Sequence, residues 1–197
     1  MTARNHFINH GYDVYRPAFY WDGPDTRKLD ECTVEIHAQD LSKVIDLTKA
    51  KHEKVYCAGH SYGGLTLLHS NPEINAVSFW DSSYIPSWLE DELETIDNSK
   101  HYSLPWGTRQ LVGKDMLEEA ISLTAPVCKD LAENFISPSQ VILAEDAQEE
   151  AIRKNLYIDL KATKELIEID GADHCFYKKD SMIQLLQHTE NWFSSHS

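Results

Sequence analysis

Short apolar runs alternate along the chain with segments whose apolar residues recur every three or four positions. Residues 76–80, 141–144 and 166–169 are almost entirely apolar and short enough to be strands buried on both faces. Residues 33–51 and 182–193 instead show the spacing of amphipathic helices. Strands separated by helices favour a mostly parallel sheet flanked by helices, and we therefore predict an α/β fold.

Further elements are expected in the N-terminal part of the chain. The turn signal His10-Gly11 leads into residues 13–19, which we predict to be a strand. Residues 54–58 form another largely apolar run, typical of a buried strand. A helix is expected to follow Gly59 and to end at Asn71-Pro72.

The length of 197 residues suits a single domain, 1–197. Residues 82–137 interrupt the alternation of strands and helices, so we predict an insertion after the strand that follows the helix 59–70. This insertion carries Trp88 and Trp106. Its aromatic residues could form a packed satellite cluster or line a ligand pocket, and the sequence leaves both interpretations open.

The net charge of −14 excludes several classes of partner. A nucleic acid or an anionic membrane surface would repel the protein, so we expect neither to be a partner. We find no apolar run near the roughly 18 residues that a membrane span needs, and no signal peptide. The four cysteines show no CxxC pair or short metal-ligand spacing. We therefore expect reduced thiols, a cytoplasmic location, no metal site and no cofactor.

The segment Gly59-His60-Ser61-Tyr62-Gly63-Gly64 lies where a predicted strand meets a predicted helix. A tight turn there would raise the hydroxyl of Ser61 above the edge of the sheet, as in a nucleophile elbow. Small residues at Gly59 and Gly63 would let the neighbouring backbone approach. The start of the helix, with the backbone N–H of Tyr62, would face a developing oxyanion. A phosphate loop is excluded because the required lysine is missing.

A serine nucleophile needs a base and an acid that orients the base. His174 follows the last predicted strand, which places it at the same carboxyl edge of the sheet as Ser61. Asp146 follows the strand 141–144 and is our first candidate for the acid. Asp81 is the rival and lies one strand nearer the serine, while Glu145 is a further alternative. His60 is treated as structural, although a side chain beside the nucleophile can line the pocket.

These motifs resemble the α/β-hydrolase-fold serine hydrolases of the esterase and lipase type over nearly the whole chain. The resemblance rests on residues 11–17, 59–63, 141–146 and 171–176. It implies that Ser61 is the nucleophile, Asp146 the acid and His174 the base, with the Tyr62 N–H as one oxyanion donor. It also implies that residues 82–137, with Trp88 and Trp106, form a cap over the active site.

The chain departs from this family ahead of the predicted elbow strand. In the family that strand is the fifth, whereas only residues 13–19 precede it here as a strand. The loop that supplies a second oxyanion donor is missing with the other strands. We expect a hydrolase of carboxylic esters of small or medium molecules. The alternatives are a weak or inactive hydrolase-fold binding module, or a peptidase or thioesterase with the same triad.

Overall fold

A parallel four-stranded sheet forms the centre of the molecule. The computed structural model describes residues 2–21, 23–92, 94–96, 101–103, 111–145, 150–178 and 180–197. The sheet consists of β1 (Tyr56–His60), β2 (Ala76–Trp80), β6 (Ser139–Ala144) and β7 (Lys164–Ile169), in the order β1-β2-β6-β7. All three neighbouring pairs are parallel, so each connection must cross over a face of the sheet.

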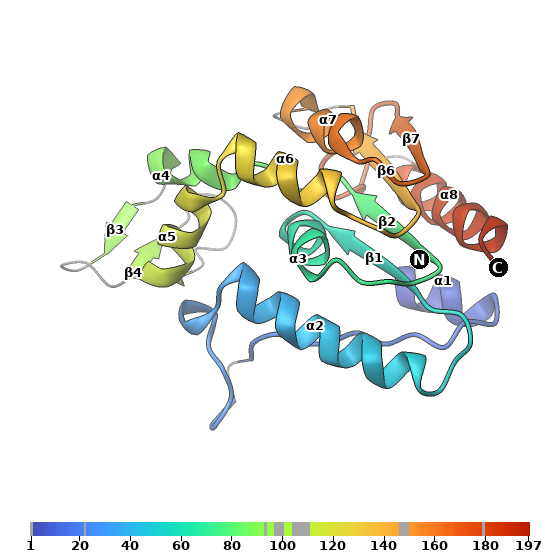
Figure 1. The fold of residues 1–197 in the computed structure, drawn as a ribbon, viewed down its shortest axis with the longest axis horizontal. Coiled ribbons are helices and arrows are strands. Elements are labelled where there is room, and N and C mark those ends of the chain that lie inside the picture. The colour runs from blue at the N-terminus through green and yellow to red at the C-terminus, as the bar shows by residue number, and fades with distance from the viewer. Residues whose placement is uncertain are drawn as a thin grey trace.

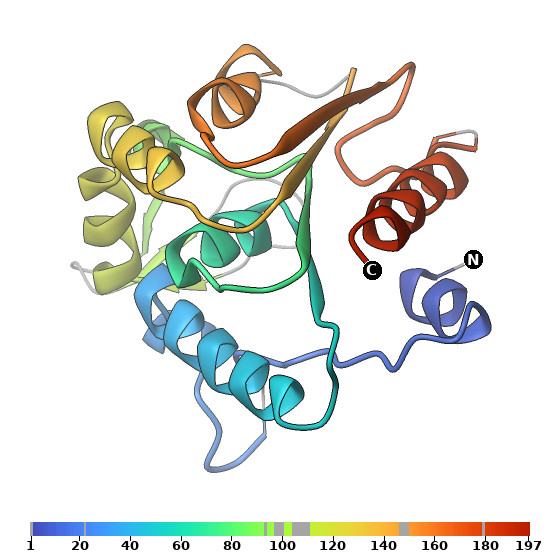
Figure 2. The same ribbon diagram turned by 45° about the vertical axis from the view of Figure 1, so that its right-hand side comes forward.

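Helices cover both faces of this sheet (Figures 1 and 2). One face carries α2 (Val34–Lys49), α3 (Tyr62–Ser70), α6 (Ala125–Glu133) and α7 (Glu150–Asp159). The other face carries α8 (Ser181–Ser195), against which α1 (Ala3–Asn9) packs. None of the helices in the described ranges is long and apolar enough to cross a membrane.

The alternation of side chains along β2 divides the core into two layers. Val77 and Phe79 are fully buried in the cluster that includes α2, α3, α6 and α7. Ala76 and Trp80 point the other way and pack under α8. Ser78 shares this second face, where its hydroxyl donates to Gln140 at 3.0 Å and accepts from the Trp80 indole at 3.0 Å. The Trp80 indole also donates to the Thr189 hydroxyl of α8 at 2.9 Å, so polar contacts as well as apolar packing hold α8 on the sheet.

The helix ends follow the local sequence. Thr33 caps α2 by accepting a hydrogen bond from the Ile36 backbone N–H at 3.1 Å. Asn71 ends α3 in the left-handed conformation, with φ 38°.

The predicted insertion, residues 82–137, contains a second, small sheet. Its strands are β3 (Glu94–Ile96), β4 (His101–Ser103) and β5 (Leu111–Gly113), paired antiparallel in that order. The 3₁₀ helix η2 (Pro86–Trp88), α4 (Leu89–Glu92) and α5 (Lys114–Ser122) complete this part, which projects to one side of the parallel sheet (Figure 1). Helix α6 belongs to the main core, because Cys128 and Ala132 are fully buried there. That residues 82–137 act as a cap stays a prediction.

One predicted element is wrong: residues 13–19 form no strand. In the described part of the chain no backbone hydrogen bond joins these residues to β1, so the run lacks the neighbour that a strand requires. The segment from Leu29 to Glu31 is a 3₁₀ helix, η1. Strand β1 begins two residues later than predicted, at Tyr56. The other predicted strands and helices are confirmed: 76–80 matches at both ends, and the ends of the others shift by at most three residues.

Candidate active site

Ser61 lies between β1 and α3 in a backbone conformation that side-chain-bearing residues seldom adopt. Its φ is 53° and its ψ is −126°, and its carbonyl accepts hydrogen bonds from the N–H groups of Gly64 and Ser83. Its own N–H donates to the Trp80 carbonyl at 3.1 Å. A non-glycine residue held at positive φ by such contacts is typical of strained functional turns. The turn lifts the serine hydroxyl off the end of β1.

Two glycines permit this turn, but they are not the pair that the sequence suggested. A Cβ on Gly59 would lie 2.7 Å from the Gly63 carbonyl oxygen, so the strand and the helix approach too closely for a side chain. A Cβ on Gly63 would meet nothing within 4 Å, so this glycine is not required sterically. Gly64 is the second tight position, because a Cβ there would lie 2.2 Å from the Ser82 hydroxyl.

His174 is hydrogen-bonded to both Ser61 and Asp81. Its Nε2 lies 3.0 Å from the Ser61 hydroxyl and its Nδ1 lies 2.5 Å from a carboxylate oxygen of Asp81. The Asp81 side chain is only 1% exposed, whereas that of His174 is 34% exposed. A serine hydroxyl, an imidazole and a buried carboxylate in this order match the geometry of a nucleophile, its general base and the group that orients the base.

Asp81 is held in place by the backbone around it. It follows β2 with φ 40°, and its N–H donates to the Ile142 carbonyl at 2.7 Å. One carboxylate oxygen also accepts from the Ala144 N–H at 3.3 Å. The ends of β2 and β6 therefore fix the carboxylate at the carboxyl edge of the sheet, where Ser61 and His174 also lie.

Arg153 of α7 forms an ion pair with Asp81 and also contacts His174, a feature that the sequence analysis missed. One guanidinium nitrogen lies against the same Asp81 oxygen that faces His174, and 2.9 Å from His174 Nδ1. A guanidinium can only donate hydrogen bonds, so its contact with Nδ1 requires an unprotonated Nδ1. The bond to Asp81 instead requires a proton on Nδ1. Arg153 and Asp81 thus favour opposite tautomers of His174.

His60 supports the loop that carries His174. Its Nε2 lies 2.7 Å from the His174 carbonyl oxygen, and the two imidazole rings are 4.8 Å apart. Burial lowers the pKa of His60 below its ordinary value. Asp173 stabilises the same loop by accepting from the N–H groups of Cys175 and Tyr177 at 3.1 and 2.9 Å. Neither His60 nor Asp173 donates to or accepts from the His174 ring.

The remaining candidate residues divide into three groups. Asp146 and Trp106 lie outside the described residues, as does the side chain of Trp88. Glu145 accepts a hydrogen bond from the Gly171 N–H at 2.7 Å, so its carboxylate is used at the start of the histidine loop. The N–H of Tyr62 begins α3 and has no hydrogen-bond partner within the described residues. This leaves it available to an oxyanion.

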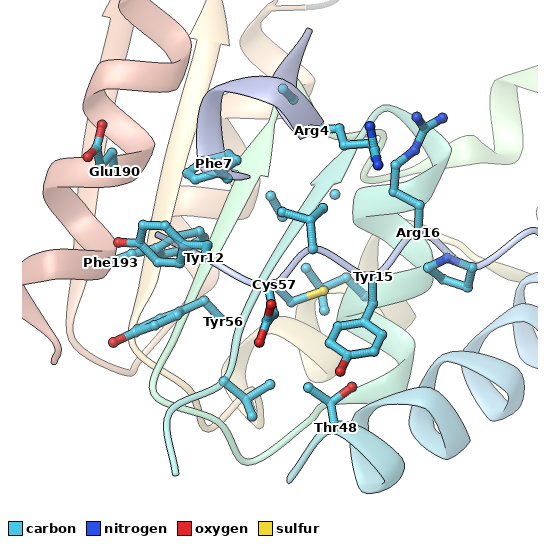
Figure 3. Close-up of a pocket in the computed structure, with 18 of the residues that line it drawn as sticks. Arg4, Phe7, Tyr12, Tyr15, Arg16, Thr48, Tyr56, Cys57, Glu190 and Phe193 are labelled. Carbon is cyan, nitrogen blue, oxygen red and sulfur yellow. The ribbon is translucent and has the colours of Figure 1, made fainter. Parts of the chain in front are cut away.

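A cavity of about 1150 Å³ lies along the free edge of β1, away from the serine hydroxyl. Figure 3 shows Tyr12 beside Tyr56 and Phe193, with Tyr15 and Arg16 on the opposite side of Cys57. The cavity separates the extended segment 13–19 from the sheet. Its lining includes His60 but neither the nucleophile nor His174, so we do not assign it as the substrate site.

The strand order, the crossover helices and a serine at the strand–helix turn define the α/β-hydrolase fold, and this chain has that fold. No protein-family model matches the sequence, and no curated protein matches it either. The solved structures with the same fold include esterases and lipolytic enzymes.

Three of these structures illustrate the likeness. The metagenome-derived lipolytic enzymes LipS and LipT give a TM-score of 0.78 at 15% identity, over 98% of this chain and 86% of theirs. Est1E from Butyrivibrio proteoclasticus gives 0.67 at 16% identity, over 84% and 71%. An esterase domain from a Rhodothermus marinus protein gives 0.62 at 21% identity, over 79% and 67%. Sequence identities this low establish the shared fold alone, and the reaction has to be inferred from the residues of the site.

Proposed function

We propose that the protein is a serine hydrolase that cleaves carboxylic esters of small or medium molecules. The observation that carries the proposal is the continuous hydrogen-bonded series from the Ser61 hydroxyl through His174 to the buried Asp81. In this proposal Ser61 is the nucleophile, His174 the general base, and Asp81, in place of Asp146, the acid that orients the base.

The reaction would proceed through an acyl-enzyme. His174 Nε2 takes the proton from Ser61 Oγ as the oxygen attacks the ester carbonyl carbon. The resulting imidazolium donates that proton to the alcohol oxygen as the carbon–oxygen bond breaks. Water then attacks the acyl-serine, His174 takes a proton from the water, and the carboxylic acid leaves as Ser61 regains its hydrogen.

The Tyr62 N–H supports the proposal as a donor to the tetrahedral oxyanion. It belongs to the first residue of α3, so the positive end of the helix dipole adds to the single hydrogen bond. A second donor is not evident within the described residues. Losing one such donor typically costs about 10²–10³ in kcat, so we expect a slower enzyme than one with a complete oxyanion hole.

The choice of an ester substrate rests on chemistry and on the structural likeness. Esters have better leaving groups than amides, so a site with one oxyanion donor favours them. Solved structures of the same fold carry the names of esterases and lipases. A thioesterase or peptidase would use the same residues, and a panel of p-nitrophenyl esters, thioesters and peptide anilides would separate these classes.

Labelling with a fluorophosphonate tests the nucleophile directly. We expect the probe to modify the folded protein at Ser61, identified by peptide mapping, and not the Ser61→Ala variant. Ser42→Ala is the matched control, because that hydroxyl bonds only to the Ala38 carbonyl within α2. Absence of label on Ser61, while a reference esterase is labelled under the same conditions, would overturn the proposal.

The contacts of Arg153 favour one second candidate, a hydrolase-fold binding module with little turnover. The guanidinium pairs with Asp81 and lies 2.9 Å from the base, which opposes the tautomer that catalysis needs. In that case the wild-type protein would bind ester analogues without hydrolysing them. Steady ester turnover that is lost in Ser61→Ala would exclude this candidate.

A further inference from the structure

His6, His10 and Glu190 bring three metal-binding side chains together where α1 meets α8. His6 lies in α1, His10 follows its last turn, and Glu190 lies in α8. One ligand atom from each side chain lies within 4.8 Å of the other two. We propose that these three side chains bind a divalent transition-metal ion of the Zn²⁺ class. The proposed site is independent of the hydrolase reaction.

The hydrogen bonds of His10 point to a cation between the three groups. His10 Nδ1 lies 2.7 Å from the His6 carbonyl oxygen, so this nitrogen carries a proton and donates it. In the neutral ring Nε2 then has a lone pair, and it faces a Glu190 oxygen at 4.0 Å. A lone pair and a carboxylate repel each other unless a proton or a metal ion lies between them. A bound metal ion supplies that charge and accepts both lone pairs.

The same hydrogen bond prepares His10 as a ligand. Metal-binding histidines commonly donate their second ring N–H to a backbone carbonyl or a carboxylate, which fixes the tautomer and the ring orientation. His6 Nε2 is hydrogen-bonded to the same Glu190 oxygen at 2.9 Å, and a metal ion would replace the proton between them. The two imidazole rings are 4.3 Å apart. The two nitrogens and the oxygen therefore converge on one point.

The spacing fits the coordination geometry of zinc. Bonds of about 2.0–2.1 Å in a tetrahedron place neighbouring ligand atoms about 3.3 Å apart. The separations from the Glu190 oxygen, 2.9 Å to His6 and 4.0 Å to His10, lie on either side of this value. Small rotations of exposed side chains would equalise them, since His10 is 45% exposed. Imidazole and carboxylate ligands suit Zn²⁺ and disfavour the softer Cu⁺.

Such an ion would join two helices that are far apart in sequence. Figure 2 shows α1 beside α8, near both ends of the chain, and Phe7 and Phe193 already make an apolar contact there. Three protein ligands leave a fourth position for water or another ligand. His10 and Glu190 also line the cavity beside β1, and Figure 3 shows Glu190 near Phe7 at its border. The open position would therefore face this cavity.

Zinc titration of the metal-free full chain tests the proposal. The protein is dialysed against EDTA, transferred to a buffer near pH 8 and titrated with ZnCl₂ in a calorimeter. Cobalt(II) is then added to a second sample, because tetrahedral cobalt gives visible absorption bands. We expect one ion per chain, a thermal midpoint that rises with zinc concentration, and the cobalt bands.

Two ligand variants and a matched control make the test specific. His10→Gln and Glu190→Gln should each weaken zinc binding by at least about tenfold and abolish the cobalt bands. His6 is not substituted because its buried ring helps α1 to pack. His188→Gln, on the same helix as Glu190, should bind as the wild type does. No zinc binding at one ion per chain, or equal binding by wild type and both ligand variants, would overturn the proposal.

Discussion

Replacing Asp81 by asparagine is the sharpest test of the catalytic assignment. An asparagine amide fits the same space, but it can stabilise the tautomer of His174 in which Nδ1 has no proton. His174 then presents an N–H to Ser61 and cannot accept its proton. In a serine protease, the corresponding change lowers kcat by about 10⁴, which corresponds to about 5.4 kcal/mol of barrier. We expect Asp81→Asn to lose activity to this extent.

The stability of this variant must be separated from its chemistry. Asp81 is 1% exposed and pairs with Arg153, whose side chain is 12% exposed. Removing one partner of a buried ion pair costs about 3–5 kcal/mol, because the other charge stays buried. The double variant Asp81→Asn with Arg153→Met removes both charges. We expect it to regain stability in urea denaturation and to remain as inactive as Asp81→Asn.

The assay is hydrolysis of p-nitrophenyl acetate, with kcat and KM measured for each folded variant. Asp146→Asn is the comparison that decides between the two candidate acids, and we expect it to keep kcat within about threefold of the wild type. Asp173→Asn controls for effects on the histidine loop. The assignment is refuted if Asp146→Asn loses more activity than Asp81→Asn, or if the double variant stays within about tenfold of the wild type.

Three further predictions concern the surroundings of the site. Arg153→Met should raise kcat/KM by up to about tenfold, because it frees His174 Nδ1 to donate to Asp81; a decrease in a folded variant would contradict this reasoning. Gly64→Ala should lower the free energy of unfolding by about 1–3 kcal/mol through its clash with Ser82, whereas Gly63→Ala should not, as measured in urea. Acid should also destabilise the protein, because burial holds the pKa of His37, His60 and His69 below the ordinary 6.5. Near that pH these three side chains therefore take up protons only in the unfolded chain, which lowers the free energy of unfolding. Urea denaturation at pH 7.5 and 5.5 should show a loss of at most about 1.4 kcal/mol per pH unit for each histidine, and a gain on acidification would exclude this linkage.

Local patterns predicted most of the sheet and two members of the candidate triad. Strand β2 and helix α2 follow from the apolar period alone. Ser61 and His174 could be predicted because each sits beside glycine or small residues in a short turn after a strand. The contact between their side chains could be predicted from the rule that the carboxyl ends of parallel strands lie at the same edge of the sheet.

The acid could not be chosen from the sequence. Asp81 and Asp146 both follow an apolar strand and both give the chain order serine, acid, histidine. We propose Asp81 on its place in three dimensions: β2 is hydrogen-bonded directly to β1, and the backbone at Asp81 turns its carboxylate toward the imidazole. No local pattern encodes that turn.

Other features depended on contacts between distant parts of the chain. Arg153 reaches the site because α7 packs on β6 and β7, which its own sequence does not reveal. The spacing of His6 and His10, four residues apart at a helix end, was a visible signal for the proposed metal site, but the third proposed ligand lies in α8. Residues 13–19 have the composition of a strand and remain unpaired because strand formation depends on a neighbour.

The order in which the chain supplies the site has a consequence for folding. Ser61 and Asp81 belong to the compact unit β1–α3–β2, whose contacts are local and can form early. His174 meets Ser61 across 113 residues, one of the long loop closures in the molecule. A ribosome-bound chain that has folded only this unit would display the serine hydroxyl without its base. The serine would thus react with an electrophile only after the C-terminal half has docked, so an incomplete chain would not be labelled at Ser61.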